Sequence, residues 1–145
     1  MKRLMILLFL SLLHLRAGCP PDYTLSIMES KPIRPFESIW RAIATVESQN
    51  NANAYNLKEN AVGLVQIRQV RLDDYKKKSG VHYNLYEMYD TIKAKEVFMF
   101  YAEKIGHDNP ERISREWNGG ERGMTKPSTK KYFAKVSEIL AFQPR

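Results

Sequence analysis

The 145-residue chain has few of the side chains that usually hold metal ions or cross-link a fold. Its single cysteine, Cys19, rules out an intrachain disulfide. The three histidines, His14, His82 and His107, stand alone, without zinc-ligand spacing to cysteines or paired acids. The same scarcity disfavours a peptidase that uses a cysteine and a histidine. We therefore expect neither a metal site nor a cofactor.

The chain also lacks an apolar run long enough to cross a bilayer, which takes about 20 residues. The longest run extends from Leu4 to Leu13, after Lys2 and Arg3 and before a group of small residues. This order predicts a secretory signal peptide over residues 1–18. An uncleaved membrane anchor is the alternative.

The basic charge is too weak for a nucleic-acid binder. Residues 1–18 hold three of the 23 basic side chains and none of the 16 acidic ones, which leaves the remainder with a net charge of about +4. Nucleic-acid binders concentrate their charge in a basic stripe, whereas a mild excess suits another anionic polymer.

The segment 19–34 is rich in proline and has little periodicity, so we expect an extended tether there. Cys19 directly follows Ala17 and Gly18 and resembles the lipid-accepting cysteine of bacterial lipoproteins, although Arg16 departs from that motif. These features predict an exported protein, either periplasmic or associated with the cell envelope, with a lipid anchor at Cys19 as one form of attachment.

The remaining chain has room for one domain, which we place at residues 35–145. Apolar residues recur at three- and four-residue steps from Phe36 to Val46, and they predict a helix ending near Ser48. Five asparagines between Gln49 and Asn60 predict a loop.

The later helices have clearer ends. Residues 61–75 fit either a short helix or an irregular apolar turn, followed by another helix. Asp90 predicts the N-cap of a helix that stops at Gly106. Asn109 and Pro110 start a short helix through Trp117, which is ended by Asn118, Gly119 and Gly120. Ser128 or Thr129 is expected to cap the last helix, whose apolar face would comprise Tyr132, Phe133, Val136, Ile139 and Leu140. No alternating strand is evident, so the fold class is mainly α.

One acid interrupts the first apolar stripe. Glu47 follows Ile43 by four residues and Trp40 by seven, so its side chain falls on the buried face. Burial raises a carboxyl pKa, which lets a glutamate donate a proton near neutral pH. The alternative is a glutamate at the end of the helix that turns to solvent or caps the next loop.

Three blocks in the sequence resemble the catalytic domain of soluble lytic transglycosylases, a lysozyme-like family. The first joins Glu47 and Ser48, through the asparagine-rich loop, to the segment 61–67 with Gly63, Leu64 and Gln66. The second and third blocks are Trp117, Asn118 and Gly119, and then Thr129, Tyr132, Lys135 and Val136. The blocks follow the family's order across residues 36–140, and together they imply a lysozyme-like single catalytic domain.

The resemblance implies peptidoglycan glycan strands as the substrate and a monomeric enzyme. Glu47 takes the place of the catalytic acid. The positions expected to contact substrate are Ser48, Asn56, Gly63, Gln66, Trp117, Asn118 and Tyr132. The register at Asn56 is shifted by a loop about one residue longer, Gly63 would let the backbone approach the sugar, and Tyr132 would close the cleft floor. Core packing is the alternative role for Gln66 and Tyr132.

The departures concern the chemistry around the acid. Val65 stands in place of methionine, Trp117 in place of tyrosine, and Ser128 where the family often has a second glutamate. The resemblance thus offers a single carboxylate, which implies transglycosylation to a 1,6-anhydro product. Glu59 keeps open a hydrolytic, goose-type-lysozyme-like route, although it could simply neutralise Lys58 or cap the next segment. A non-catalytic module that binds the cell wall is the third hypothesis.

Overall fold

The computed structural model describes residues 36–142. The expected signal peptide (1–18), the tether (19–34) and Cys19 lie outside the described residues, and so does Pro35. Between Phe36 and Phe142, none of the helices has both the length and the apolar character that a bilayer crossing requires.

The mainly α class is confirmed. The described part contains five α-helices, two short 3-10 helices and a small sheet, in this order: α1 (Glu37–Ser48), β1 (Tyr55–Asn56), β2 (Ala61–Val62), β3 (Ile67–Arg68), α2 (Gln69–Ser79), η1 (Leu85–Tyr89), α3 (Thr91–Ile105), α4 (Pro110–Gly119), η2 (Gly123–Thr125) and α5 (Pro127–Phe142).

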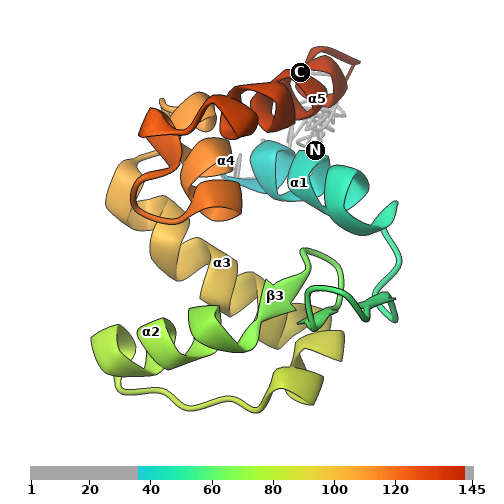
Figure 1. Ribbon diagram of the computed structural model, residues 1–145, viewed down its shortest axis with the longest axis vertical. Coiled ribbons are helices and arrows are strands. Elements are labelled where there is room, and N and C mark those ends of the chain that lie inside the picture. Colours follow the sequence, from blue (N-terminus) through green and yellow to red (C-terminus); the bar gives the residue numbers. More distant parts are fainter. Residues whose placement is uncertain (1–35, 143–145) are drawn as a thin grey trace, which may run out of the picture. The chain divides into compact units, whose positions relative to one another are not determined.

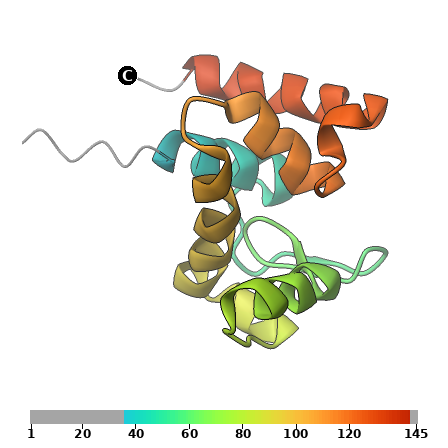
Figure 2. The same ribbon diagram turned by 90° about the vertical axis from the view of Figure 1, so that its left-hand side faces the viewer.

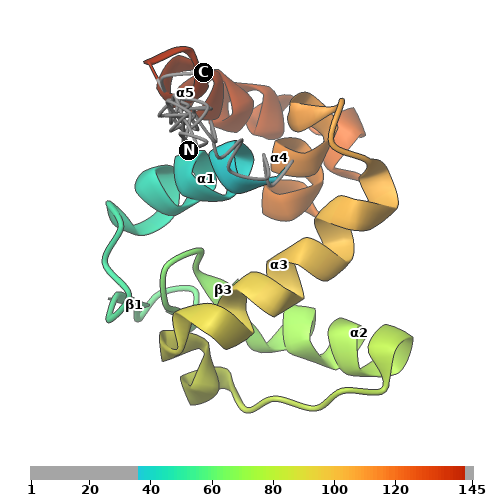
Figure 3. The same cartoon turned by 180° about the vertical axis from the view of Figure 1, so that it is seen from behind.

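Helix α3 separates two groups of elements. α1, α4 and α5 pack against one another on one side, while the sheet, α2 and η1 lie on the other (Figures 1 and 2). α3 contacts η1 in the second group and α4 in the first, as the view from behind also shows (Figure 3). The apolar core is continuous between them, with Phe98 of α3 fully buried.

α1 forms as its periodicity predicts. Ile39, Trp40 and Ile43 are buried along one face, and the helix ends at Ser48. Gln49 leaves the helix in a left-handed conformation with φ of 55°, which an ordinary residue adopts only rarely. The helix therefore carries its last turn, with Glu47, to the edge of the core.

The sheet is a correction to the sequence analysis, which found no strand and expected a loop over 49–60. β1, β2 and β3 form an antiparallel sheet in that order, with Tyr55 opposite Val62 and Val62 opposite Ile67. Each strand has two residues, and both residues of the central strand are buried. A pattern that alternates every second residue cannot show itself over such a length.

The caps of the two middle helices are confirmed. The Asp90 carboxylate accepts hydrogen bonds from the backbone N–H groups of Ile92 and Lys93, and the Asn109 side chain accepts one from Arg112. α3 ends at Ile105 and α4 ends at Gly119, and the glycine that follows each helix, Gly106 or Gly120, has a positive φ. These helix ends were predictable from the sequence because each depends on side chains within one turn of the helix end.

The start of α5 differs from the prediction. The helix begins at Pro127, so Ser128 and Thr129 lie in its first turn and neither is the residue before it. Proline fits there because its fixed φ is already helical and its missing N–H is not needed. Thr129 is buried. The predicted apolar face of α5 does pack on the core, with Val136 fully buried.

Candidate active site

Glu47 lies in the last turn of α1, where α5 packs against it (Figure 1). The Tyr132 hydroxyl of α5 donates a 2.7 Å hydrogen bond to Glu47 Oε1. Residues 85 positions apart are thus brought into direct contact, in agreement with the expectation that Tyr132 lies near the acid.

Burial raises the pKa of Glu47 from 4.5 to about 6, because an ionised carboxylate loses hydration there. The hydrogen bond from Tyr132 acts against this rise, since it stabilises the ionised form. Among the nearby charges, Glu59 raises the Glu47 pKa further and Arg68 lowers it. The pKa of Tyr132 is itself raised, first by burial and then by the Glu47 charge. Tyr132 therefore stays a hydrogen-bond donor to Glu47.

A cleft of about 640 Å³ opens beside Glu47. Four of the residues expected at the site line it: Glu47, Gln66, Trp117 and Asn118. They come from α1, from the turn between β2 and β3, and from the end of α4. Glu59 lines the cleft too, so both carboxylates considered from the sequence face the same space.

Gln66 holds its turn through its side chain. Its Nε2 atom donates hydrogen bonds to the carbonyl oxygens of Gly63 (2.9 Å) and Ala54 (3.4 Å). Its φ is 52°, an uncommon value for a residue with a side chain. No described residue donates a hydrogen bond to its amide oxygen. Every buried side-chain oxygen in the described part has a partner, so this oxygen is not buried. That oxygen is therefore accessible from the cleft.

Ser48 and Asn56 shape loops next to the cleft. The Ser48 hydroxyl lies 2.8 Å from the Leu64 carbonyl oxygen and 3.1 Å from the Asn51 backbone nitrogen, which ties the end of α1 to the turn before Gln66. Asn56 accepts hydrogen bonds from the backbone N–H groups of Lys58 and Glu59. Neither residue lines the cleft. Their contact with substrate stays a prediction.

Gly63 has a structural requirement that the sequence did not suggest. It has a φ of +80°, and a Cβ atom built on it would lie 2.1 Å from the carbonyl oxygen of Met88 in η1. The missing side chain thus makes room for η1. Gly63 does not line the cleft, and its expected approach to substrate remains untested.

Trp117 is largely a core residue, with only 7% of its surface exposed. Its indole N–H donates to the Val65 carbonyl oxygen at 3.2 Å, and its ring lies 5.2 Å from that of Phe98 between centroids. The guanidinium of Arg71 sits 4.7 Å from the ring centroid. Protein atoms therefore occupy much of the ring's surroundings, and the predicted stacking of a sugar on Trp117 stays untested.

Sequence reasoning did not single out two arginines that matter here. Arg71 lines the cleft, and Arg115 is buried with 3% exposure behind it. Neither interrupts an apolar pattern as Glu47 does. Their positions depend on approaches between distant helices, for which the sequence holds no local signal. Glu59, by contrast, was considered, but it pairs with Arg68 at 3.7 Å instead of Lys58.

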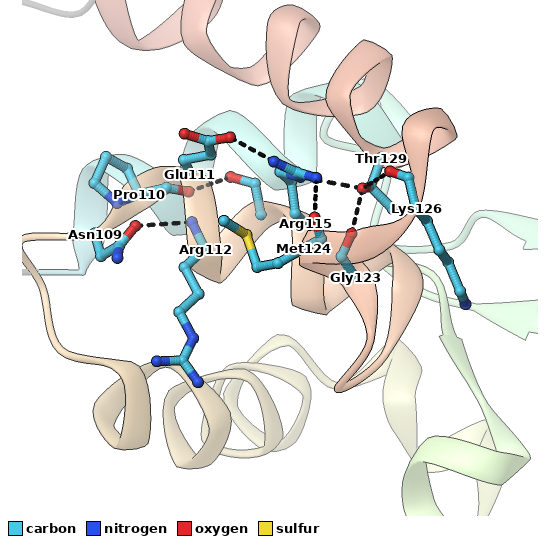
Figure 4. A network of polar contacts seen from close by, with 10 residues as sticks. Asn109, Pro110, Glu111, Arg112, Arg115, Gly123, Met124, Lys126 and Thr129 are labelled. Atoms are coloured by element: carbon cyan, nitrogen blue, oxygen red, sulfur yellow. Dashed lines mark hydrogen bonds and ion pairs between the residues drawn. The ribbon is translucent and has the colours of Figure 1, made fainter.

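Arg115 holds the connection between α4 and α5 together (Figure 4). Its Nε donates to the Thr129 hydroxyl (3.1 Å), one terminal nitrogen to the Glu111 carboxylate (2.6 Å) and the other to the Met124 carbonyl oxygen (2.5 Å). Thr129 in turn lies 2.6 Å from the Gly123 carbonyl oxygen. This network fixes the segment that leads from Asn118 back to α5.

The described residues contain no group of three or more histidine, cysteine, aspartate or glutamate side chains placed to hold a metal ion. The site combines a partly buried carboxyl group with a raised pKa, a tyrosine hydroxyl that is hydrogen-bonded to it, and a cleft lined by four helices and the sheet.

Comparison with known proteins gave one family. The family model described as the Transglycosylase SLT domain matches residues 26–132, which spans Glu47, the cleft and Tyr132. No curated protein and no solved structure matched the chain.

Proposed function

Because the chain belongs to the Transglycosylase SLT domain family, whose members are peptidoglycan enzymes of the lytic transglycosylase type, we propose that it cleaves the MurNAc–GlcNAc glycosidic bond with Glu47 as its single catalytic carboxylate. The observation that carries this proposal is the Glu47–Tyr132 hydrogen bond of 2.7 Å beside the cleft, with a Glu47 pKa of about 6.

In the first step, protonated Glu47 donates its proton to the glycosidic oxygen, and the bond between this oxygen and C1 of the muramyl sugar breaks. The leaving sugar takes the bonding electron pair and the proton as a free hydroxyl. Positive charge at C1 is stabilised by the carbonyl oxygen of the sugar's own N-acetyl group. A raised carboxyl pKa is what a general acid requires, since the group must still hold a proton near neutral pH.

In the second step, the 6-hydroxyl of the same muramyl sugar attacks C1 and its proton passes to the Glu47 carboxylate. The product is a 1,6-anhydro ring, water is not consumed, and Glu47 regains its starting state. An internal nucleophile is favoured because well-oriented intramolecular groups reach effective molarities of about 10⁵ M or more. Most glycosidases need a second carboxylate for this task.

Mass analysis of the muropeptides released from purified peptidoglycan tests the proposal. We expect products about one water lighter than hydrolytic products and without a reducing end. Glu47→Gln should lower the rate by about 10²- to 10⁴-fold, the usual contribution of general acid catalysis. The amide keeps the shape and still accepts the Tyr132 hydrogen bond. A variant with more than about a tenth of the parent rate would reject Glu47 as the acid.

Hydrolysis is the second candidate, because Glu59 lines the same cleft and its charge acts on Glu47. Under the proposed mechanism, Glu59→Gln changes the rate by less than about tenfold, or about 1.4 kcal/mol of barrier. Reducing-end products that disappear in Glu59→Gln would show instead that Glu59 activates water.

We further propose that the enzyme acts in the cell envelope after export, on the basis of Lys2, Arg3 and the apolar run that follows them. Fractionation of cells and mass analysis of the mature N-terminus test this. A lipid on Cys19 should be lost in Cys19→Ala, which would move the protein from the membrane to the soluble fraction.

A further inference from the structure

Arg71 packs against two neighbouring aromatic rings at the side of the cleft. It lies near the start of α2, and its guanidinium carbon sits 4.6 Å from the ring centroid of Tyr101 on α3 and 4.7 Å from that of Trp117 on α4. A planar cation that packs against aromatic rings is stabilised by cation–π attraction and is restricted in orientation. Three elements thus fix one guanidinium group.

Only part of this guanidinium is used within the protein. Nη2 donates to the carbonyl oxygens of Trp117 (2.7 Å) and Glu116 (3.3 Å), near the C-terminal end of α4. Among residues 36–142, neither Nε nor Nη1 has a hydrogen-bond acceptor. Every buried side-chain nitrogen in this part of the chain has a partner, so these two nitrogens are not buried. Because Arg71 lines the cleft, these two N–H groups are accessible from it.

The positive charge of Arg71 is not paired either. In the part of the chain that the structure describes, no carboxylate lies within 4.0 Å of its nitrogens. The nearby carboxylate of Asp74 instead accepts a 2.7 Å hydrogen bond from Tyr101 and pairs with Lys78 at 2.9 Å. Arg71 is therefore a positioned cation beside the cleft with N–H groups left for a ligand oxygen, and charge-assisted hydrogen bonds of this kind bind a carboxylate.

We propose that Arg71 binds a carboxylate of the muramic acid substituent and so sets which sugars of the strand lie on which side of Glu47. This inference rests on the proposed function. Muramic acid carries a lactyl group, whose carboxyl is free or extended by a peptide that itself bears carboxylates, whereas N-acetylglucosamine carries no acid. A fixed cation in the cleft therefore distinguishes the two alternating sugars.

Binding to soluble strands tests the proposal without turnover when it is measured by calorimetry in the Glu47→Gln background. The ligands are neutral oligomers of N-acetylglucosamine, glycan strands freed of peptide, and strands that retain peptide. Arg71→Met keeps an apolar stem against the rings and removes the donors. We expect it to weaken binding of the acidic strands by about tenfold or more, and binding of the neutral oligomer by less than about threefold.

The matched control is Lys95→Met, which removes a cation 5.8 Å from the ring centroid of Trp40, away from the cleft. It should change the affinity for none of the ligands. A loss confined to one acidic strand identifies the source: strands freed of peptide offer only the lactyl carboxylate, and peptide-bearing strands offer only the peptide's. Equal weakening of all three ligands, or of none, overturns the proposal.

A second measurement avoids any effect of mutation on folding. Methyl esterification of the carboxylates on the acidic strands should weaken their binding to the protein with Arg71 intact by the same factor of about ten. Unchanged affinity after esterification overturns the proposal. A parent protein that releases anhydro products yet fails these binding tests refutes the role of Arg71 alone, whereas a parent that releases none refutes the proposed function.

Discussion

Glu47 and Arg115 both place a charged side chain among apolar ones, but they differ in how many hydrogen-bond partners the charged group has. Every nitrogen of the Arg115 guanidinium has an acceptor, namely Thr129, Glu111 and the Met124 carbonyl oxygen. Glu47 has one described hydrogen-bond partner, Tyr132, and faces the cleft. A buried charge with all its hydrogen bonds satisfied holds structure in place, while one with fewer partners keeps a proton available for chemistry.

The largest effect on stability is expected at Arg115, because every nitrogen of its guanidinium has an acceptor. Arg115→Met should lower the free energy of unfolding by about 2–4 kcal/mol, because it leaves the Met124 carbonyl oxygen and the Glu111 carboxylate without their donor. Urea unfolding at neutral pH measures this. The control is Arg112→Met, whose half-exposed pair with Glu116 should be worth less than about 1 kcal/mol. Equal losses in the two variants would contradict the contrast.

At Glu47, by contrast, substitution should raise the free energy of unfolding near neutral pH. Its pKa in the fold, about 6, lies above the ordinary value of 4.5, so the folded state favours the protonated form. The resulting stability is complete below pH 4.5 and is lost as the pH rises through 6. Glu47→Gln cannot ionise, and at pH 7.5 it should be more stable than the parent by up to about 2 kcal/mol.

Urea unfolding at pH 4 and pH 7.5 checks this difference, which should shrink at the lower pH. Glu59→Gln should weaken the pH dependence of stability, because it removes a charge that raises the Glu47 pKa. Parallel pH dependence in the parent and in Glu47→Gln would show that the acid is not destabilised by burial.

The smallest effect is expected from a substitution of Tyr132, which should change the pH dependence of activity. Tyr132→Phe removes the donor that stabilises ionised Glu47, so the Glu47 pKa should rise further. Activity that requires protonated Glu47 falls as the pH rises through this pKa, and in the variant that fall should move to higher pH. Tyr83→Phe, which removes a hydroxyl bound to Glu96 instead, should leave the profile unchanged. A fall at lower pH would reverse the assigned role of Tyr132.

The helices were predictable from the sequence because their signals are local. The stripe from Phe36 to Val46, the cap at Asp90 and the stop at Gly106 each depend on neighbours within a turn or two. The sheet was missed because two-residue strands carry no periodicity. Its existence depends on turns such as Gly63, where backbone conformation and the approach of η1 decide the geometry.

The sequence predicted only part of the candidate site. Periodicity placed Glu47 on the buried face, and the family resemblance added Tyr132 and Gln66. The sequence could not show that Trp117 is covered by Arg71, nor that Thr129 serves Arg115 instead of capping α5. Each of those contacts joins helices whose relative placement is set by the whole core, so no spacing along the chain encodes it.

The hydrogen bond between Glu47 and Tyr132 has a consequence for the order in which the protein is made. The acid is synthesised early, but the hydroxyl that positions it arrives 85 residues later, in the last helix. A nascent or truncated chain that ends before α5 lacks this donor. The contact that positions the proposed catalytic acid therefore forms only after α5 has docked against α1.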